Sequence, residues 1–545
     1  METVLENLNI SCSIPENDRN RIPREGPVIV TANHLYGQAD AWVLAKALLS
    51  VRTDVRIIIR GRAQGAPGSE SIWVWNPVEA KPAAILAEAE DWLKRGGVLG
   101  IFPAETPRTL VHLKRKNRDK SWDPLLADLI GKTNAQVLPA VLTNPRAGMF
   151  HLLGLAARSR PLAVRFPKGI PGLGLTVVEV GIGNVIPFSR LNRFESGDKL
   201  IEYLRLKTNM LGRRDNKPGQ AKALSRTGEA GKDFQPIAPP VDPEALAGEI
   251  AGLPGDSLLV ESGKFRVFEA EASSIPLLIR EIGRLREVTF REVGEGTGLA
   301  LDTDVFDRYY RHLFLWNSQD KELVGGYRLG LSDKIVQGYG KEGFYTYTLF
   351  KYSKRFIEEI SPALELGRSF VRPEYQKTYQ ALMLLWKGIG EFVARRPRYK
   401  ILFGPVSITS DYHSASRHLI AAYLRENIHR DDLARLVKPR NPLQKREALG
   451  RDINAALPLL QDIHELSDLV SDIEDDSKGI PILLKQYVKL GGKSLCFNVD
   501  QNFQDVLDAL ILVDLTQTDN RILERYMGHE GARTFGEYHR KAEAL

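Results

Sequence analysis

Residues 33–40 read Asn33-His34-Leu35-Tyr36-Gly37-Gln38-Ala39-Asp40. The apolar run at residues 28–30 predicts a buried strand before this stretch, and the apolar spacing of residues 41–49 predicts a helix after it. The glycine-containing turn between strand and helix would bring the carboxylate of Asp40 back to the imidazole of His34. Asp40 would then hold the ring in one tautomer, and the other ring nitrogen would be free to take a proton from an acceptor hydroxyl.

Both residues also have a purely structural interpretation. Asp40 is well placed to cap the N-terminus of the predicted helix, and His34 could be an ordinary histidine at the end of a strand. No serine or cysteine lies beside the pair as an obvious nucleophile. The simplest chemistry is therefore direct attack of the deprotonated acceptor on an activated acyl group.

Length and composition predict a soluble globular protein with more than one domain. The chain has 545 residues, of which 43% are apolar and 26% are charged. At roughly 150 residues per domain, this length allows three to four units or two large ones. The N-terminus has no signal pattern, and no apolar run approaches the roughly 18 residues of a membrane span. We therefore expect a cytoplasmic protein that associates peripherally with the inner face of the membrane.

The net charge indicates which binding partners to expect, and the cysteine spacing indicates whether to expect a metal site. The formal net charge of +7 favours acidic partners, such as anionic lipid headgroups or an acidic acyl carrier protein. Nucleic acid is not expected, because no nucleic-acid module or zinc-finger spacing is present. Cys12 and Cys496 lie at opposite ends of the chain and form no metal-ligand or redox spacing, so no metal site is predicted.

The N-terminal half has the pattern of an α/β fold. Apolar runs at residues 57–59 and 98–102 predict strands, and residues 83–94 between them have helical spacing. This order is typical of a parallel sheet covered by helices. Arg60 and Arg62 would lie at the end of the first of these strands, where a guanidinium group can hold a phosphate or carboxylate. A solvated strand end would carry the two arginines equally well.

The N-terminal half resembles the glycerolipid acyltransferases. In that family four residues usually separate the histidine of an Asn-His pair from an aspartate; here there are five, a spacing similar to the O-acyltransferases of ornithine-lipid and related aminolipid synthesis. Residues 102–108 are similar to the family's third motif, Phe-Pro-Glu-Gly-Thr-Arg, with the glutamate displaced. The resemblance implies that His34 and Asp40 are catalytic. It also implies a set of acceptor-binding residues: Arg60, Arg62, Phe102, Pro103, Glu105, Thr106 and Arg108.

A basic run follows this turn, at residues 114–120. Charge runs are usually solvated loops. The alternative is a lip that draws an anionic lipid or an acidic acyl carrier to the site.

The composition changes in the middle of the chain. Residues 213–219 and 236–243 are rich in proline, glycine and charge and have little periodicity. We therefore predict an N-terminal domain at residues 1–212, a linker at 213–262 and a C-terminal domain at 263–545.

The C-terminal half has the order strand, helix, hairpin, strand, helix. The strands are predicted at residues 265–270, 312–316, 323–328 and 364–371, and the helices at 275–290 and 378–393. This order is that of the N-acyltransferase, or acetyltransferase-like (GNAT), fold, an α+β arrangement. In that fold the loop before the second helix presents backbone N–H groups to the phosphates of the donor.

Residues 301–304, 365–375 and 482–492 resemble the ornithine N-acyltransferases. The resemblance implies that Glu365 is a candidate catalytic base and that Arg368 and Arg372 hold the phosphate of the acyl donor. The co-substrate would be acyl-CoA or acyl-acyl carrier protein, with no bound cofactor.

Together the two resemblances predict a bifunctional aminolipid synthase of the ornithine-lipid type. The C-terminal half would transfer a fatty acyl group to the amine of an amino acid, and the N-terminal half would then acylate a hydroxyl of the lyso-lipid. One alternative is a lysophosphatidate acyltransferase with a non-catalytic C-terminal half. The other is a non-catalytic protein that binds a carrier or a membrane.

Overall fold

The computed structural model describes residues 5–6, 10–35, 38–60, 72–75, 82–103, 122, 124–143, 176–214, 234–444, 457–503 and 505–543. The chain divides into two compact units. The first unit consists of Met1–Lys217 and Leu449–Gly479, and the second of Pro218–Ala448 and Ile480–Leu545. Among the described helices, none is long and apolar enough to cross a lipid bilayer.

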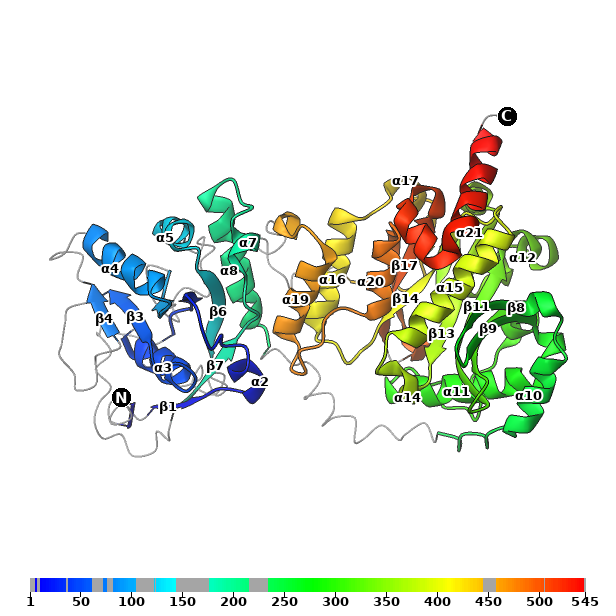
Figure 1. Ribbon diagram of the computed structural model, residues 1–545, viewed down its shortest axis with the longest axis horizontal. Helices are drawn as coiled ribbons and strands as arrows, with labels where there is room; N and C mark the ends of the chain where they lie inside the picture. Colours follow the sequence, from blue (N-terminus) through cyan, green and yellow to red (C-terminus); the bar gives the residue numbers. More distant parts are fainter. Residues whose placement is uncertain are drawn as a thin grey trace. The chain divides into compact units, whose positions relative to one another are not determined.

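The first unit is built on a seven-stranded sheet (Figure 1). Its strands lie in the order β1-β7-β6-β2-β5-β3-β4, and all neighbours are parallel except β6 and β7. The predicted parallel α/β sheet is therefore confirmed. The strands are β1 (Ile10–Ser13), β2 (Val28–Thr31), β3 (Val55–Arg60), β4 (Ile72–Trp75), β5 (Val98–Ile101), β6 (Gln136–Thr143) and β7 (Thr176–Ile182).

Strand β2 lies in the middle of this sheet and is buried along its whole length. Such burial explains its uninterrupted apolar sequence, because parallel strands are covered on both faces. The described helices of this unit are α2 (Glu16–Arg19), α3 (Gln38–Leu49), α4 (Pro82–Lys94), α5 (Leu125–Thr133), α7 (Phe188–Leu191), α8 (Gly197–Leu211) and α19 (Ile463–Ile473).

Helix α19 comes from a part of the chain that was predicted to lie in the C-terminal domain. It packs against α8, and Leu449–Gly479 belongs to the first unit. The Nζ atom of Lys207 lies 2.8 Å from Oδ2 of Asp472, and Arg193 pairs with Glu465. The predicted range 263–545 is thus interrupted by a segment that the first unit binds through buried charges.

The second unit contains an eight-stranded sheet in the order β16-β17-β14-β13-β11-β10-β9-β8. The pairs are antiparallel apart from β13 and β14. The strands are β8 (Leu258–Ser262), β9 (Phe265–Glu271), β10 (Arg311–Asn317), β11 (Glu322–Leu331), β13 (Ala363–Val371), β14 (Ile401–Ile408), β16 (Lys493–Asp500) and β17 (Val506–Asp514). The predicted hairpin is confirmed as β10 and β11.

The helices of the second unit lie around this sheet (Figure 1). They are α10 (Pro243–Ala251), α11 (Pro276–Glu292), α12 (Ser332–Tyr339), α13 (Lys354–Ile360), α14 (Pro373–Gln376), α15 (Gln380–Arg395), α16 (Ser414–Asn427), α17 (Asp431–Ala434), α20 (Ile482–Lys489) and α21 (Asn520–Glu543). A separate pair of short strands, β12 (Phe350–Tyr352) and β15 (Val437–Pro439), completes the unit. The predicted helices at 275–290 and 378–393 correspond to α11 and α15.

Part of the predicted linker is regular structure. Asp242 caps α10 by accepting a hydrogen bond from the backbone N of Ala245, and Pro243 occupies the first turn. Strand β8 pairs with β9 at the edge of the sheet. The prolines that suggested a linker therefore include one that begins a helix, where proline is tolerated because no intrahelical N–H is needed.

Strands β13 and β14 separate after a short parallel contact. They pair from Ala363 with Ile401 to Glu365 with Phe403, although both strands continue beyond these residues. The pairing of β13 with β11 on its other side is irregular opposite Arg368, which has a φ of 47°. The sheet is therefore interrupted in its interior, between β13 and β14, and not at one of its edges.

Candidate functional site

A cavity of ≈ 630 Å³ lies where β13 and β14 separate. Its walls come from the end of α11, the strands β11, β13, β14 and β17, the loop before α15 and the start of α20. The side chains that line it include Glu295, Tyr327, Arg368, Leu382, Ser407, Leu483 and Asp508. A volume of this size accommodates a small-molecule substrate.

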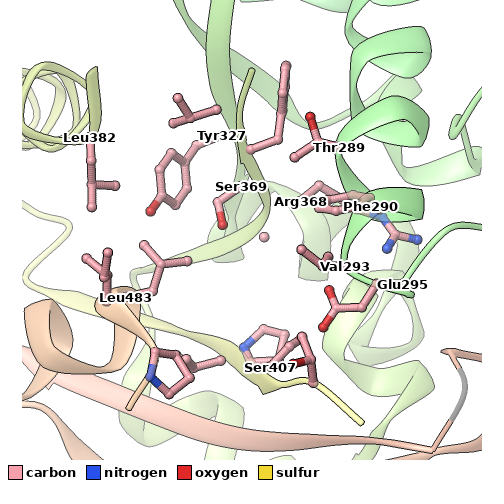
Figure 2. A pocket seen from close by; sticks show the side chains of 18 of the residues that line it. Thr289, Phe290, Val293, Glu295, Tyr327, Arg368, Ser369, Leu382, Ser407 and Leu483 are labelled. Carbon is pink, nitrogen blue, oxygen red and sulfur yellow. The ribbon is translucent and has the colours of Figure 1, made fainter. Parts of the chain in front are cut away.

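The cavity wall is chemically uneven. Figure 2 shows Leu382 and Leu483 on one side, with Glu295 on the other. The carboxyl groups of Asp500 and Asp508 also line the cavity. One side therefore suits an apolar chain, and carboxyl groups in the wall suit a cationic amine.

Two of the cavity acids hold their protons unusually tightly. Burial raises the pKa of Glu295 to about 7; Arg368 opposes this effect, and Asp411 and Asp500 add to it. Burial, followed by the nearby carboxyl group of Asp500, raises the pKa of Asp508 to about 8. Desolvation disfavours the charged form of a carboxyl group, which accounts for the direction of both shifts.

Asp508 is fixed by its neighbour on β14. Its Oδ1 accepts a hydrogen bond of 3.0 Å from Oγ of Ser407, the residue that lies opposite it in the strand pairing. By contrast, Oε1 of Glu295 is buried and has no hydrogen-bond partner within the described ranges. Neither acid was predicted from the sequence as a site residue. For Glu295, the run of alternating glycines at residues 294–298 was the available signal.

Arg368 lines the cavity, but carboxylates already face its guanidinium group. Nε lies 3.6 Å from Oδ2 of Asp302, and Nη2 lies 3.9 Å from Oδ2 of Asp304. The guanidinium also stacks over Tyr345 and Phe503, at 5.0 and 4.9 Å from the ring centroids. Burial lowers the pKa of Arg368, but Tyr345 and the aspartates more than offset this effect, so its net pKa is raised. Arg368 thus contributes a fixed, largely neutralised charge.

Arg372 lies just before α14 and is not among the residues that line the cavity. Its guanidinium lies 3.5 Å from Glu322 and 3.2 Å from Glu374. The structure therefore does not bring Arg368 and Arg372 together as an open anion site.

The side chain of Glu365 does not lie where a base for an acceptor in the cavity would be expected. Its side chain is 1% exposed and does not line the cavity. One carboxylate oxygen accepts a hydrogen bond from the hydroxyl of Tyr310, and the other accepts one of 2.6 Å from the backbone N of Thr346. Burial raises the pKa of Glu365, and the hydrogen bonds from Thr346 and Tyr310 oppose the rise. A carboxyl group held in this way cannot reach an acceptor in the cavity without breaking both bonds.

The first unit brings three of the predicted residues together. Nδ1 of His34 lies 3.2 Å from Oδ2 of Asp40, and the ring of His34 stacks on Phe102 with centroids 4.5 Å apart. Strands β2 and β5 are parallel neighbours, so the residues that follow their carboxyl ends meet. Asp40 is the third residue of α3 and also accepts a hydrogen bond of 2.8 Å from the backbone N of Leu35.

This geometry gives His34 a defined orientation. Because the carboxylate of Asp40 accepts from Nδ1, the Nε2 atom is left as the basic nitrogen. Asn33 fixes the backbone beside it, through bonds of 2.7 and 3.0 Å to the N and O atoms of Leu142.

The remaining predicted residues have less structural description. Pro103 is buried beside Phe102, and Arg60 ends β3, but its side chain is outside the described part. Four more predicted residues and the basic run at 114–120 lie outside the described residues: Arg62, Glu105, Thr106 and Arg108. Within the described residues, no group of histidine, cysteine, aspartate and glutamate side chains could hold a metal ion.

Comparison with known proteins identifies the second unit. The acetyltransferase (GNAT) domain model matches residues 285–387, which include the end of α11, the β10–β11 hairpin and β13. A glycine N(alpha)-acyltransferase of Phocaeicola vulgatus is 33% identical over 269 residues, which are 46% of this chain and 78% of that protein. A glycine N(alpha)-acyltransferase of Bacteroides thetaiotaomicron is 33% identical over 306 residues, or 53% of this chain and 89% of that protein.

A relative with lower sequence identity is named for a different acceptor amino acid. The L-ornithine N(alpha)-acyltransferase of Brucella abortus is 25% identical over 299 residues, which are 51% of this chain and 93% of that protein. All three relatives match about half of this chain. The chain belongs to the GNAT-type N(alpha)-acyltransferase family that includes these enzymes, and it is an enzyme that transfers acyl groups.

Proposed function

We propose that the second unit transfers a fatty acyl group from a thioester donor to the amino group of an amino acid, as a step of membrane-lipid synthesis. The observation that carries this proposal is the cavity between β13 and β14, which has apolar side chains on one side and carboxyl groups in its wall. The relatives named above, which use glycine or ornithine, support an amino acid as the acceptor. The donor is acyl-CoA or acyl-acyl carrier protein.

Among the described strands, none pairs with the β14-facing side of β13 beyond Glu365, and this side of the strand suits such a donor. From Leu366 to Val371 this strand lines the cavity, beyond the last residue that pairs with β14. Backbone N–H and C=O groups on this side are available to an extended, amide-containing arm, because such groups need partners wherever they are buried. An acyl chain carried on that arm would enter between Leu382 and Leu483.

The proposal assigns a second acyl transfer to the first unit. His34, oriented by Asp40, takes the proton from a hydroxyl group of the N-acylated product, and the oxygen attacks the carbonyl carbon of a second thioester. The C–S bond breaks as the ester forms, and the sulfur leaves as the free thiol after it takes the proton from His34. The net charge of +7 draws the enzyme to the anionic inner face of the membrane, where both products are retained. A lysophosphatidate acyltransferase with an inactive second unit is the less favoured candidate, because the acetyltransferase (GNAT) domain model matches residues 285–387 of that unit.

Lipid analysis tests the two steps together. A bacterial host that expresses the parent chain is expected to contain both the N-acyl amino acid and its diacylated form. The His34→Ala variant should accumulate the monoacylated product, because loss of a positioned base slows transfer by about 10²- to 10⁴-fold. His464→Ala, on the exposed face of α19, is the matched control and should leave the ratio of the two lipids unchanged.

Two results would contradict the proposal. A parental lipid ratio in the His34→Ala variant would remove the role of the first unit. A parent chain that acylates lysophosphatidate, and no amino acid, would favour the other candidate.

A further inference from the structure

The proposed N-acyl transfer needs a proton acceptor, because the amine of an amino acid is mostly protonated at neutral pH and a protonated amine cannot attack the thioester. Glu365, the predicted base, is buried outside the cavity. Glu295 lines the cavity and comes from the five-residue loop that directly follows the end of α11 and Val293.

The loop at residues 294–298 is held by a buried carboxylate. Glu287 accepts hydrogen bonds from the backbone N of Thr297 at 3.0 Å, from its Oγ1 at 2.7 Å and from the backbone N of Gly298 at 2.8 Å. The backbone N of Glu295 itself donates to the O atom of Phe290 at 2.7 Å. These bonds fix the backbone on both sides of Glu295, so its side chain projects from a rigid part of the loop.

The glycines of this loop are required by its shape. Gly294 and Gly298 have φ angles of 75° and 82°, which residues with a side chain rarely adopt. A Cβ atom on Gly296 would lie 2.5 Å from Cγ of Arg291. The sequence around Glu295 thus serves one tight loop that ends in the cavity wall.

One oxygen of Glu295 is left for a ligand. Oε1 is buried and has no hydrogen-bond partner among the residues that the structure describes. Buried polar atoms are normally paired, so an unpaired oxygen in the wall of a cavity indicates that a substrate supplies the partner. An ammonium group can donate a hydrogen bond to this oxygen, and its positive charge complements that of the carboxylate.

We propose that Glu295 is the catalytic residue that accepts the proton of the acceptor amine, an assignment that rests on the proposed N-acyl transfer. The carboxylate removes one proton from the ammonium group, and the free nitrogen attacks the carbonyl carbon of the thioester. The C–N bond forms as the C–S bond breaks. The sulfur leaves as the thiol after it takes the second proton that the nitrogen gives up, so the products are the amide, the free thiol of the donor and protonated Glu295.

The electrostatics of the site agree with this role. A base works best when its pKa is near the working pH, and burial brings the pKa of Glu295 to about 7. The charged groups that act on Glu295 are Arg368 from β13, Asp411 after β14 and Asp500 from β16. Asp508, the other buried acid, is already engaged by Ser407 and holds its proton to a higher pH.

The test uses the full-length chain with a long-chain acyl-CoA as donor and glycine or ornithine as acceptor. In Glu295→Gln we expect the kcat of amide formation to fall by about 10²- to 10⁴-fold. The rise of the parent rate with pH, centred near 7, should disappear, and the rate of the variant should follow the ionisation of the free amine instead. Glu295→Asp keeps the carboxyl group on a shorter side chain, so it should lower kcat but retain the rise with pH.

Glu292→Gln is the matched control, since Glu292 is an exposed glutamate at the end of the same helix. It should keep the rate and the pH profile of the parent. Parental kcat and pH profile in Glu295→Gln would overturn the assignment, as would loss of the pH-dependent rise in Asp508→Asn alone. A parent enzyme that makes no amide from any amino acid would overturn the proposed function and this role together, whereas amide formation by both parent and Glu295→Gln would overturn only the role of Glu295.

Discussion

At the residue scale, the second unit carries acids whose environment changes their chemistry. Asp508 is the third residue of β17 and is 4% exposed. In the unfolded chain its carboxyl group would ionise near the usual value for aspartate, whereas in the folded protein its pKa is about 8. The folded state therefore binds this proton more tightly than the unfolded state does.

This difference predicts a pH-dependent gain of stability in Asp508→Asn. Between pH 4 and pH 8, roughly the window between the two pKa values, the parent loses stability as pH rises, because folding must bury a group that the unfolded chain would ionise. The asparagine variant keeps an oxygen that accepts from Ser407 and has no charge to bury. Its free energy of unfolding should exceed that of the parent by about 1.4 kcal/mol or more at pH 8, and the gain should shrink towards pH 5.

Urea unfolding at both pH values, followed by tryptophan fluorescence, would measure this difference. The control is Asp519→Asn, which changes an exposed aspartate of the same unit. An equal effect of Asp508→Asn at pH 5 and pH 8 would show that burial does not raise the pKa of this group.

At the element scale, α19 joins the first unit through a buried ionic cluster. Asp472 is fully buried, and its Oδ1 accepts hydrogen bonds from the backbone N and Nδ2 of Asn184 at 2.7 and 2.8 Å. Its Oδ2 lies 2.8 Å from Nζ of Lys207, whose side chain is 1% exposed. The helix also buries leucine, valine and isoleucine side chains along the same face. Apolar packing and paired charges thus hold one element together with α8.

Breaking this cluster from one side should destabilise the first unit strongly. Asp472→Ala leaves the ammonium group of Lys207 buried without its closest carboxylate, which costs about 3–5 kcal/mol. Asp468→Ala, in the same helix, removes a partly exposed partner of Arg190 and should cost less than about 1 kcal/mol. Hydrogen exchange of peptides from α8, measured against urea concentration, would separate the two variants, and equal protection in both would contradict the role of Asp472.

At the scale of the whole molecule, the chain leaves the first unit and later returns to it. The first segment of this unit ends at Lys217. Its second segment, Leu449–Gly479, follows more than two hundred residues that belong to the second unit. A split of the chain within residues 218–233 therefore leaves the two pieces sharing one core. This connectivity distinguishes the molecule from two domains joined only by a tether.

Co-expression of residues 1–217 and 234–545 as separate chains should consequently give two fragments that purify together. A tag on either fragment would retrieve the other, since α19 of the longer fragment completes the first unit. Combining Glu465→Ala with Asp472→Ala should reduce recovery of the untagged fragment at least tenfold, a factor equivalent to about 1.4 kcal/mol. Full recovery with the double variant would show that α19 does not hold the fragments together.

Features that depend on local pattern were predictable from the sequence. The buried strand β2 and the pairing of His34 with Asp40 involve residues close together in the chain. Apolar spacing predicted the strand, and the resemblance to the glycerolipid acyltransferases favoured the pairing over a purely structural interpretation. The β10–β11 hairpin and the order of elements in the second unit were also predictable from apolar spacing.

Which acids face the cavity depends on contacts between residues that are far apart in the chain. Glu365 and Glu295 are both glutamates beside glycine-containing segments, yet Tyr310 and Thr346 bind the first in the interior and the cavity receives the second. The return of α19 to the first unit was likewise not visible in the local pattern. Apolar periodicity shows that a face is buried but not which distant face covers it, because packing and buried charge pairs join residues that are far apart in the chain.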